Sequence, residues 1–133
     1  MRDWLYVKDH CEAIMTVLEK GAPGETYNIG GNQEKPNLDV VQTICAKLDR
    51  LRPQSNGKSY CELITFVKDR AGHDRRYAID ASKIKSQLGW SPKEDFASGI
   101  EKTISWYLDH QDWVDAVVSG AYKDWVNQQY IDR

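Results

Sequence analysis

The alternation of two kinds of segment along the chain constrains its fold more than any other feature. Short runs rich in aromatic and β-branched residues predict three strands, "DWLYV" (3–7), "ETYNI" (25–29) and "LITFV" (63–67). Other segments carry apolar residues every three or four positions, as on one face of a helix. The resulting order, β-α-β-α-β-α-α with a short helical tail, predicts an α/β domain of mixed α+β character.

The first predicted helix carries clear boundary signals. We expect Asp9 to be its N-cap, with Glu12 three residues later, and Gly21 to follow its last turn. Its apolar stripe has helical spacing and is expected to face a core; it consists of Cys11, Ile14, Met15 and Leu18.

Three further helices follow from the same signals. One begins near Asn37, a short one occupies "DASKIKSQLG" (80–89), and the longest runs from about residue 95 to residue 110. Proline and an Asn-Gly step mark residues 52–59 as a loop. The many aromatic residues of the tail predict that it packs rather than remaining disordered.

Length and charge narrow the classes of function. A chain of 133 residues fits one domain with a buried core, and its formal net charge of −2 gives no general attraction to nucleic acid or anionic membranes. No apolar run reaches the ~18 residues that a membrane span requires, and the first ten residues lack the pattern of a signal peptide. We therefore expect a cytoplasmic protein with neither nucleic acid nor a membrane as partner.

The cysteines suggest neither a disulfide framework nor a zinc site. Cys11, Cys45 and Cys61 are widely spaced and form no C-x-x-C pair. Reduced thiols in a cytoplasm are the simple interpretation. Because Cys11 and Cys45 fall on apolar helical faces, we expect both to be small buried hydrophobes.

The densest polar segment is "VKDRAGHDRRYAID" (67–80), which directly follows the third predicted strand. Ligand-binding loops of α/β domains lie at such strand ends. Arginine suits bidentate contacts with phosphate, and Gly72 permits a close approach of the backbone. The residues alone leave two interpretations equally open: an anion site, or a solvated turn with internal Arg–Asp ion pairs.

No familiar catalytic motif accompanies this segment. The sequence contains no G-x-G-x-x-G, no P-loop, no G-x-S-x-G and no H-E-x-x-H. The three histidines, His10, His73 and His110, lie far apart in the sequence, so no metal site is predicted. The polar segment is therefore the one site candidate that the residues alone provide.

Six segments together resemble a known family, and they are "RDWLYVKDHCEAI", "GETYNIGG", "NLDVVQTIC", "ITFVKDRAGHDRRYAIDASKI", "LGWSPKEDFASGIEKTISWYL" and "SGAYKDWV". They closely resemble the C-terminal part of the dTDP-D-glucose 4,6-dehydratases, which are extended short-chain dehydrogenases. The pattern D-R-x-G-H-D-x-R-Y (69–77) is the specific element, and the similarity covers essentially the whole chain. The resemblance implies the substrate-binding part of an extended Rossmann-type dehydrogenase, without the nucleotide-binding Rossmann core.

The resemblance implies an NAD-dependent lyase. Members of the family oxidise C4 of the sugar, eliminate water across C5 and C6, and return the hydride to C6. The product, dTDP-4-keto-6-deoxy-D-glucose, leads to L-rhamnose and other deoxysugars. Their N-terminal Rossmann domain carries NAD, a Tyr-x-x-x-Lys pair and an Asp-Glu pair. None of these motifs occurs here, so we assign no catalytic residue to this chain and expect it to bind no cofactor alone.

The family's contacts with the nucleotide sugar carry over by position. The resemblance implies that Arg2 and Arg70 bind diphosphate oxygens and that Asn37 contacts the nucleotide side of the ligand. Other residues of the 69–73 loop would line the same pocket, with a tyrosine reaching in from the tail. The full set is Arg2, Asn37, Asp69, Arg70, Ala71, Gly72, His73 and Tyr130.

Several of these residues also have structural interpretations. Asn37 would serve as a helix cap worth about 1 kcal/mol without any ligand. His73 could pair with Asp69 or Asp74, and Tyr130 could simply pack. The neighbouring arginines, Arg75 and Arg76, are expected to support structure rather than touch ligand. Ala71 replaces a proline that is usual in the family, which loosens the loop backbone.

The resemblance also implies a partner. We expect residues 1–51 to pack on a Rossmann portion that this chain lacks, and residues 61–133 to form the substrate-binding lobe. Apolar faces of the first helix and of "ETYNI" would then be open, which predicts marginal stability or a homo-oligomer. We expect a truncated, inactive piece of the enzyme. The alternatives are a non-catalytic nucleotide-sugar-binding module, and half of a split enzyme that needs an N-terminal partner.

Overall fold

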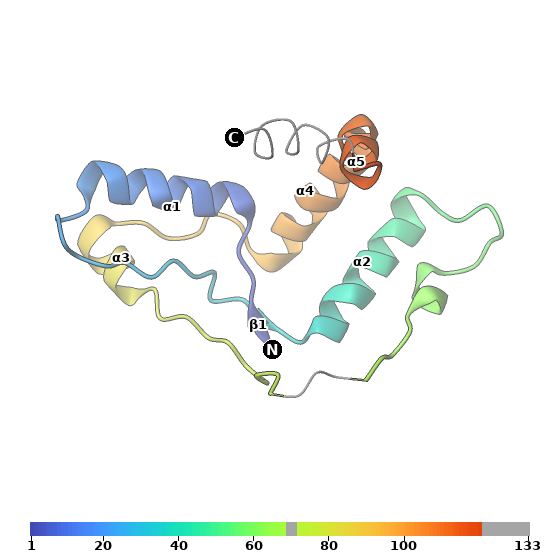
Figure 1. The fold of residues 1–133 in the computed structure, drawn as a ribbon, viewed down its shortest axis with the longest axis horizontal. Helices are drawn as coiled ribbons and strands as arrows, with labels where there is room; N and C mark the ends of the chain where they lie inside the picture. Colours follow the sequence, from blue (N-terminus) through green and yellow to red (C-terminus); the bar gives the residue numbers. More distant parts are fainter. Residues whose placement is uncertain (69–71, 121–133) are drawn as a thin grey trace, which may run out of the picture. The chain divides into compact units, whose positions relative to one another are not determined.

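A computed structural model describes residues 1–68 and 72–120 of the chain. The chain divides into two compact units, Met1–Glu101 and Lys102–Arg133. Helices dominate the described residues (Figure 1). In chain order, the elements are β1 (Arg2–Asp3), α1 (Val7–Lys20), β2 (Glu34–Lys35), α2 (Asn37–Leu51), the 3-10 helix η1 (Tyr60–Leu63), α3 (Ser82–Leu88), α4 (Phe96–Asp109) and α5 (Gln111–Val118).

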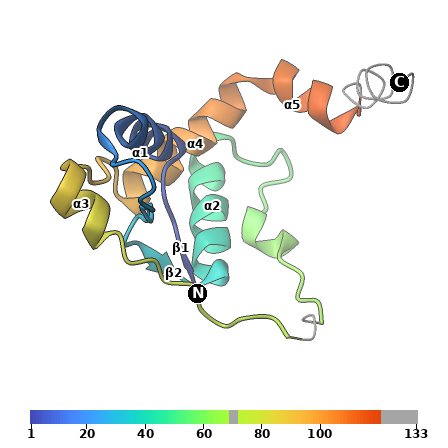
Figure 2. The same ribbon diagram turned by 60° about the vertical axis from the view of Figure 1, so that its left-hand side comes forward.

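The two strands form a small antiparallel sheet. Arg2 of β1 pairs with Lys35 of β2, and Asp3 pairs with Glu34. Figure 2 shows β1 and β2 side by side near the first turn of α2. The sheet therefore places Arg2 close to the N-terminal end of α2, because only one residue separates Lys35 from that helix.

Asp3 organises the chain that leads into β2. Its carboxylate accepts hydrogen bonds from the backbone N–H of Gly31 at 2.9 Å and of Gln33 at 2.7 Å. Gly31 must be a glycine here, because an added Cβ atom would lie 2.0 Å from the carbonyl oxygen of Trp4. Asp3, the residue after Arg2, therefore holds β1 against the segment that leads into β2.

The core of the first unit lies between α1 and α3 (Figure 1). Ile84 of α3 is completely buried, as the apolar pattern of that helix predicts. Gly89 ends α3 at φ 72, and its N–H donates to the carbonyl of Lys85. The other buried members of the core are Ala13, Ala81 and Trp90. The prediction of a short helix within residues 80–89 is confirmed.

Two of the predicted strands are wrong. Residues 25–29 have no regular structure, and the strand of this region is β2 instead. Part of the third predicted strand is η1, and residues 64–67 have no regular structure. The first strand is shorter than expected, because α1 already begins at Val7. β-propensity measures how well side chains fit a pleated surface, and among the described residues only β1 and β2 form a ladder.

Asp9 does not cap α1, because the helix begins two residues earlier. It lies in the first turn and is 3% exposed. Its Oδ2 atom accepts a hydrogen bond from the backbone N–H of Glu94 at 2.9 Å. Asp9 therefore ties α1 to the segment that precedes α4, a contact that no local pattern reveals.

The predicted apolar stripe of α1 faces outward rather than into the core. Met15 is 53% exposed and Leu18 is 74% exposed. Cys11 is exposed as well, so its expected burial is wrong, whereas Cys45 in α2 is buried as expected. The core side of α1 instead carries Ala13, which packs with the residues of α3.

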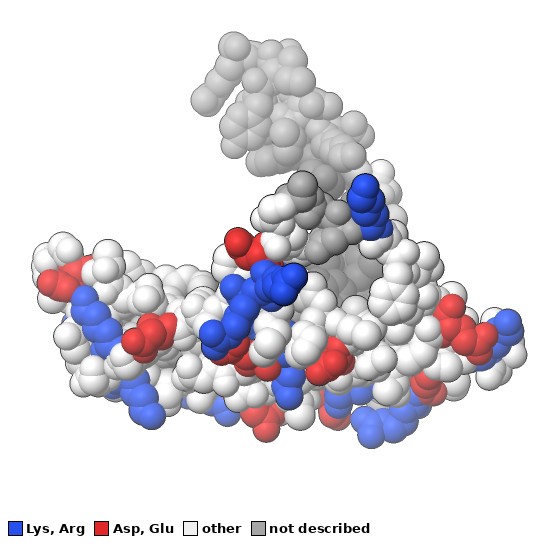
Figure 3. Space-filling view, turned by 90° about the horizontal axis from the view of Figure 1, so that it is seen from below, with Lys and Arg blue, Asp and Glu red and all other residues white. Residues whose placement is uncertain are grey.

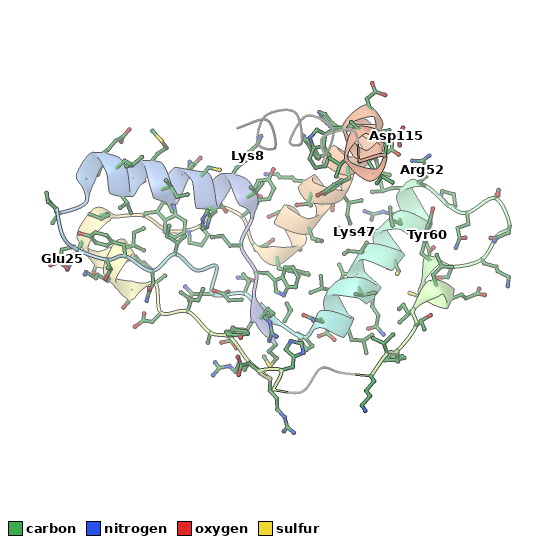
Figure 4. The ribbon with its side chains drawn as sticks, in the orientation of Figure 1. Lys8, Glu25, Lys47, Arg52, Tyr60 and Asp115 are labelled. Carbon is green, nitrogen blue, oxygen red and sulfur yellow. The ribbon has the colours of Figure 1, made fainter. Side chains whose placement is uncertain are left out.

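α2 begins at Asn37, as predicted, and ends at the expected loop. The cap position is held by Pro36, so Asn37 is the first helical residue and not the cap. Lys47 on α2 donates to the Glu101 carboxylate of α4 at 2.6 Å (Figure 4). The long predicted helix is confirmed as α4.

The second unit has an aromatic cluster. The ring of Trp106 stacks on that of His110, with centroids 4.4 Å apart and planes at 14°. Trp113 of α5 meets Trp106 edge to face at 5.2 Å. This confirms that the first part of the predicted tail is helical and packed. Tyr122, Trp125 and Tyr130 lie outside the described residues.

Candidate functional site

The segment 72–77 runs beside β1 and brings predicted site residues together. The N–H of Tyr77 donates to the carbonyl of Met1 at 3.1 Å. Figure 1 shows this segment passing the N-terminus, close to β1. Arg2 and the segment 72–77 therefore lie next to each other.

Arg2 and His73, two of the predicted substrate-contacting residues, touch each other. The Nη2 atom of Arg2 lies 2.6 Å from the Nε2 atom of His73, and both side chains are half-buried. A guanidinium can only donate hydrogen bonds, so Nε2 accepts and the imidazole proton lies on Nδ1. Arg2 is therefore one partner of His73, and the expected alternative pairing with Asp69 or Asp74 stays a prediction.

The aromatic ring of Tyr77 contacts the guanidinium of Arg2. Tyr77 was not predicted as a site residue. The guanidinium carbon lies 4.4 Å from the centroid of the Tyr77 ring, a cation–π arrangement. The Tyr77 hydroxyl donates to the carboxylate of Asp74, and this hydrogen bond raises the pKa of Tyr77. One signal in the sequence could have indicated its role, because Tyr77 is the last residue of the D-R-x-G-H-D-x-R-Y pattern.

Arg76 fastens the same segment to β2. Its Nε and Nη2 atoms each donate to one carboxylate oxygen of Glu34, both at 2.6 Å. This bidentate pair lowers the pKa of Glu34, chiefly through the hydrogen bonds from Arg76. The interpretation that Arg76 supports structure is confirmed.

Asn37 lies at the same end of the molecule as Arg2. It is exposed at the first helical position of α2, two residues after the cross-strand partner of Arg2. The first N–H groups of a helix have no intrahelical acceptor, and the helix dipole favours an anion there. Figure 2 shows β1 and this helix end at one edge of the molecule.

Gly72 is exposed at φ 71, a left-handed conformation that favours glycine. Nothing lies within 4 Å of a Cβ atom added there. Asp69, Arg70 and Ala71, together with Tyr130, lie outside the described residues, so their predicted roles remain predictions.

The charge on this side of the molecule is mixed. Figure 3 looks onto the lower edge of Figure 1, and Lys or Arg side chains alternate with Asp or Glu side chains on the face it shows. Such a face gives no broad attraction to polyanions. It is compatible with a local anion site built from a few oriented donors.

Comparison with known proteins defines the family. A family model described as GDP-mannose 4,6 dehydratase matches residues 1–103. The chain belongs to this family.

Within the family, the chain is similar to dTDP-glucose 4,6-dehydratases over its whole length. It is 59% identical over 133 residues to dTDP-glucose 4,6-dehydratase 1 of Escherichia coli K12, covering 100% of this chain and 36% of the relative. It is 58% identical over 123 residues to the enzyme of Xanthomonas campestris pv. campestris, covering 92% and 35%. The chain thus spans about a third of the length of these relatives. The resemblance inferred from the sequence is confirmed.

Solved structures agree. The dTDP-glucose 4,6-dehydratase of Bacillus anthracis in complex with NAD matches with a TM-score of 0.67 and 46% identity, over 84% of this chain and 32% of that one. The enzyme of Streptomyces venezuelae with NAD and TYD bound matches with a TM-score of 0.66 and 36% identity, over the same shares. The structural neighbours have an extended Rossmann-type fold, of which this chain matches about a third.

The NAD of these neighbours finds no matching site among the described residues. A dinucleotide site needs a parallel strand, a glycine-rich loop and a helix. The described residues form one antiparallel pair of strands, and the sequence has no G-x-G-x-x-G.

Proposed function

We propose that this chain is the C-terminal, nucleotide-sugar-binding part of a dTDP-glucose 4,6-dehydratase. The carrying observation is the contact between Arg2 and His73, which joins β1 to the D-R-x-G-H-D-x-R-Y segment beside the start of α2. Similarity to enzymes of that name over all 133 residues supports the proposal.

The site would bind the diphosphate of a dTDP-sugar. Arg2 and Arg70 donate to its phosphate oxygens, and Asn37 hydrogen-bonds the nucleotide side. Each hydrogen bond to a charged group contributes about 1.5–3 kcal/mol. Held between the Tyr77 ring and His73, Arg2 loses less side-chain entropy when the ligand binds.

The remaining loop residues complete the pocket. As the family resemblance implies, Asp69, Ala71, Gly72 and Tyr130 would also contribute to it. His73 keeps Arg2 oriented toward the ligand. In the whole enzyme, NAD supplies hydride transfer when it is bound, and this chain's residues bind and orient the substrate.

A Rossmann portion like that of the relatives would complete the enzyme. We propose that residues 1–51 pack against it and that residues 61–133 form the substrate-binding lobe. The outward apolar face of α1 supports this arrangement, since Val7 is 63% and Leu18 74% exposed. The chain alone is then inactive and prone to self-association, and the complete enzyme works in the cytoplasm on the route to deoxysugars such as L-rhamnose.

Calorimetric titration with dTDP and with UDP tests the binding role. Arg2→Ala should weaken the affinity for dTDP by about tenfold or more, the effect of losing one charge-assisted hydrogen bond. Arg52→Ala, at the far end of α2, is the matched control and should bind like the wild type. Equal affinity of the Arg2 and Arg52 variants would reject the assignment of Arg2 to the diphosphate.

A further inference from the structure

Cys45 and Cys61 form a thiol pair that the proposed function does not use. Cys45 lies in α2 and is buried, whereas Cys61 lies in η1 and is exposed. Cys61 is among the neighbouring groups that raise the pKa of the Cys45 thiol. The Cys61 thiol is therefore accessible to reagents in solution, and the Cys45 thiol lies inside the protein on α2, the helix to which η1 is hydrogen-bonded.

Hydrogen bonds between α2 and η1 hold the two cysteines in this arrangement. The Asp49 carboxylate accepts from the backbone N–H of Tyr60 at 2.8 Å, and the Tyr60 hydroxyl donates to the carbonyl of Arg52 at 2.9 Å. Figure 4 shows Tyr60 beside Arg52 at the end of α2. Cys45 lies one helical turn before Asp49 and so shares its face of α2, and Cys61 directly follows Tyr60.

A second hydrogen bond to the Asp49 carboxylate strengthens the connection between α2 and η1. The Ser59 hydroxyl donates to Asp49 at 2.5 Å and also accepts from the N–H of Cys61 at 3.1 Å. The backbone of Cys61 is therefore fixed relative to α2 before any reaction occurs. Disulfide formation is favoured where two backbone segments are already held against each other, because the bond tolerates little deviation in geometry.

We propose that Cys45 and Cys61 are a reversible disulfide site that reacts with low-molecular-weight disulfides such as oxidised glutathione. Metal binding is the competing chemistry for a thiol pair. In the described part of the chain, however, no three His, Cys, Asp or Glu side chains gather into a metal-binding group.

The exchange takes place in two steps. The exposed Cys61 thiolate attacks one sulfur of oxidised glutathione; the disulfide bond breaks, and one glutathione leaves as its thiolate. The Cys45 thiolate then attacks the Cys61 sulfur of the mixed disulfide, forms the protein disulfide and releases the second glutathione. The protein gives up two electrons and two protons, and one glutathione disulfide becomes two glutathione molecules.

The two thiols have different roles because their surroundings differ. Burial raises the pKa of the Cys45 thiol, and the neighbouring Cys61 side chain and the Asp49 carboxylate raise it further. The thiolate is the attacking species. The second step is therefore the slow one at neutral pH, and it accelerates as the pH rises.

Peptide mapping by mass spectrometry tests the site on the full chain. The chain is incubated with oxidised glutathione at neutral pH and at about pH 9, above the ordinary thiol pKa, and then alkylated. We expect a linked peptide pair that contains Cys45 and Cys61, formed faster at the higher pH and lost on reduction. Cys61→Ser should abolish the link, and Cys11→Ser, which removes the exposed cysteine of α1, should leave it unchanged.

Two results would overturn the proposal. One is a mixed disulfide on Cys61 that persists at the higher pH while Cys45 is recovered in alkylated form. The other is a level of modification at Cys61 equal to that at Cys11, with no linked pair in monomeric protein.

Discussion

The Nη2 atom of Arg2 lies 2.6 Å from the Nε2 atom of His73, although 71 positions separate the two residues in the sequence. Pairing of β1 with β2 places Arg2, and the hydrogen bond from Tyr77 to Met1 places the segment that carries His73. The contact orients a permanently charged guanidinium beside the N-terminal end of α2. A positive charge next to the N-terminal end of a helix is an arrangement that can bind an anion.

Substitution of Tyr77 separates the two contacts of its side chain. Tyr77→Ala removes the ring beneath Arg2, and an exposed cation–π pair contributes about 0.5–1 kcal/mol, so the Kd for dTDP should rise about two- to fivefold. Tyr77→Phe keeps the ring and loses only the bond to Asp74, so its Kd should stay close to that of the wild type. Calorimetry measures both. An equal loss in the two variants would show that the ring does not position Arg2.

The pair of Arg76 with Glu34 makes stability depend on pH in a defined direction. Hydrogen bonds from Arg76 lower the folded-state pKa of Glu34. The stabilisation is therefore fully present above the unfolded-state pKa of about 4.3, and it is lost as the pH falls through the lower folded value. Glu34→Gln should unfold at lower urea concentration than the wild type at neutral pH, and this difference should shrink in acid.

Glu19→Gln, on the exposed side of α1, is the control for that experiment. Urea titrations of all three proteins at a series of pH values give the comparison. A difference between Glu34→Gln and the wild type that stays constant with pH would contradict the stabilising role of the ion pair.

The buried carboxylate of Asp9 should be worth more to stability than its position near a helix start suggests. Asp9→Ala removes the acceptor for the N–H of Glu94, and a hydrogen bond to a charged group contributes about 1.5–3 kcal/mol. Asp9→Asn retains a carbonyl acceptor and should cost less. Asp39→Ala removes an exposed acid from the first turn of α2 and serves as the control. If Asp9→Ala and Asp39→Ala cost the same free energy of unfolding, the contact with Glu94 is unimportant.

The outward face of α1 predicts association of the isolated chain. Met15→Gln with Leu18→Gln removes two large exposed apolar side chains from α1. If the wild type associates through that face, as we propose, this double variant should elute later than the wild type in size-exclusion chromatography. Val118→Gln, at an exposed apolar site on α5, should elute like the wild type. Dilute monomer in every case would show that the face needs no partner.

In the described part of the chain, the positions of the helices were largely predictable from the sequence, whereas two of the three predicted strands were wrong. The apolar spacing of Ile84 and Leu88, with Gly89 after them, located α3 because burial and the αL cap are local properties. Residues 25–29 and 63–67 have strand-like composition without a strand partner among the described residues. Composition reflects how well side chains fit a sheet surface, whereas strand pairing depends on segments that are distant in the sequence.

The same distinction holds for the candidate site. Arg2 and His73 came from the family resemblance, and their mutual contact is a tertiary fact that neither flanking sequence contains. Asp9 shows the reverse case, in which a good local capping pattern is overridden by a partner 85 positions away. Tyr77 and Glu34 were missed because their roles exist only once segment 72–77 lies along the sheet.

Co-expression tests the central proposal most directly. The chain is produced together with the part of the Escherichia coli relative that lies outside the matched region, and the complex is supplied with NAD and dTDP-glucose. The proposal predicts formation of dTDP-4-keto-6-deoxyglucose, with a rate at low substrate that falls about tenfold or more in Arg2→Ala. A stable complex that forms no product, or a rate that Arg2→Ala leaves unchanged, would contradict it.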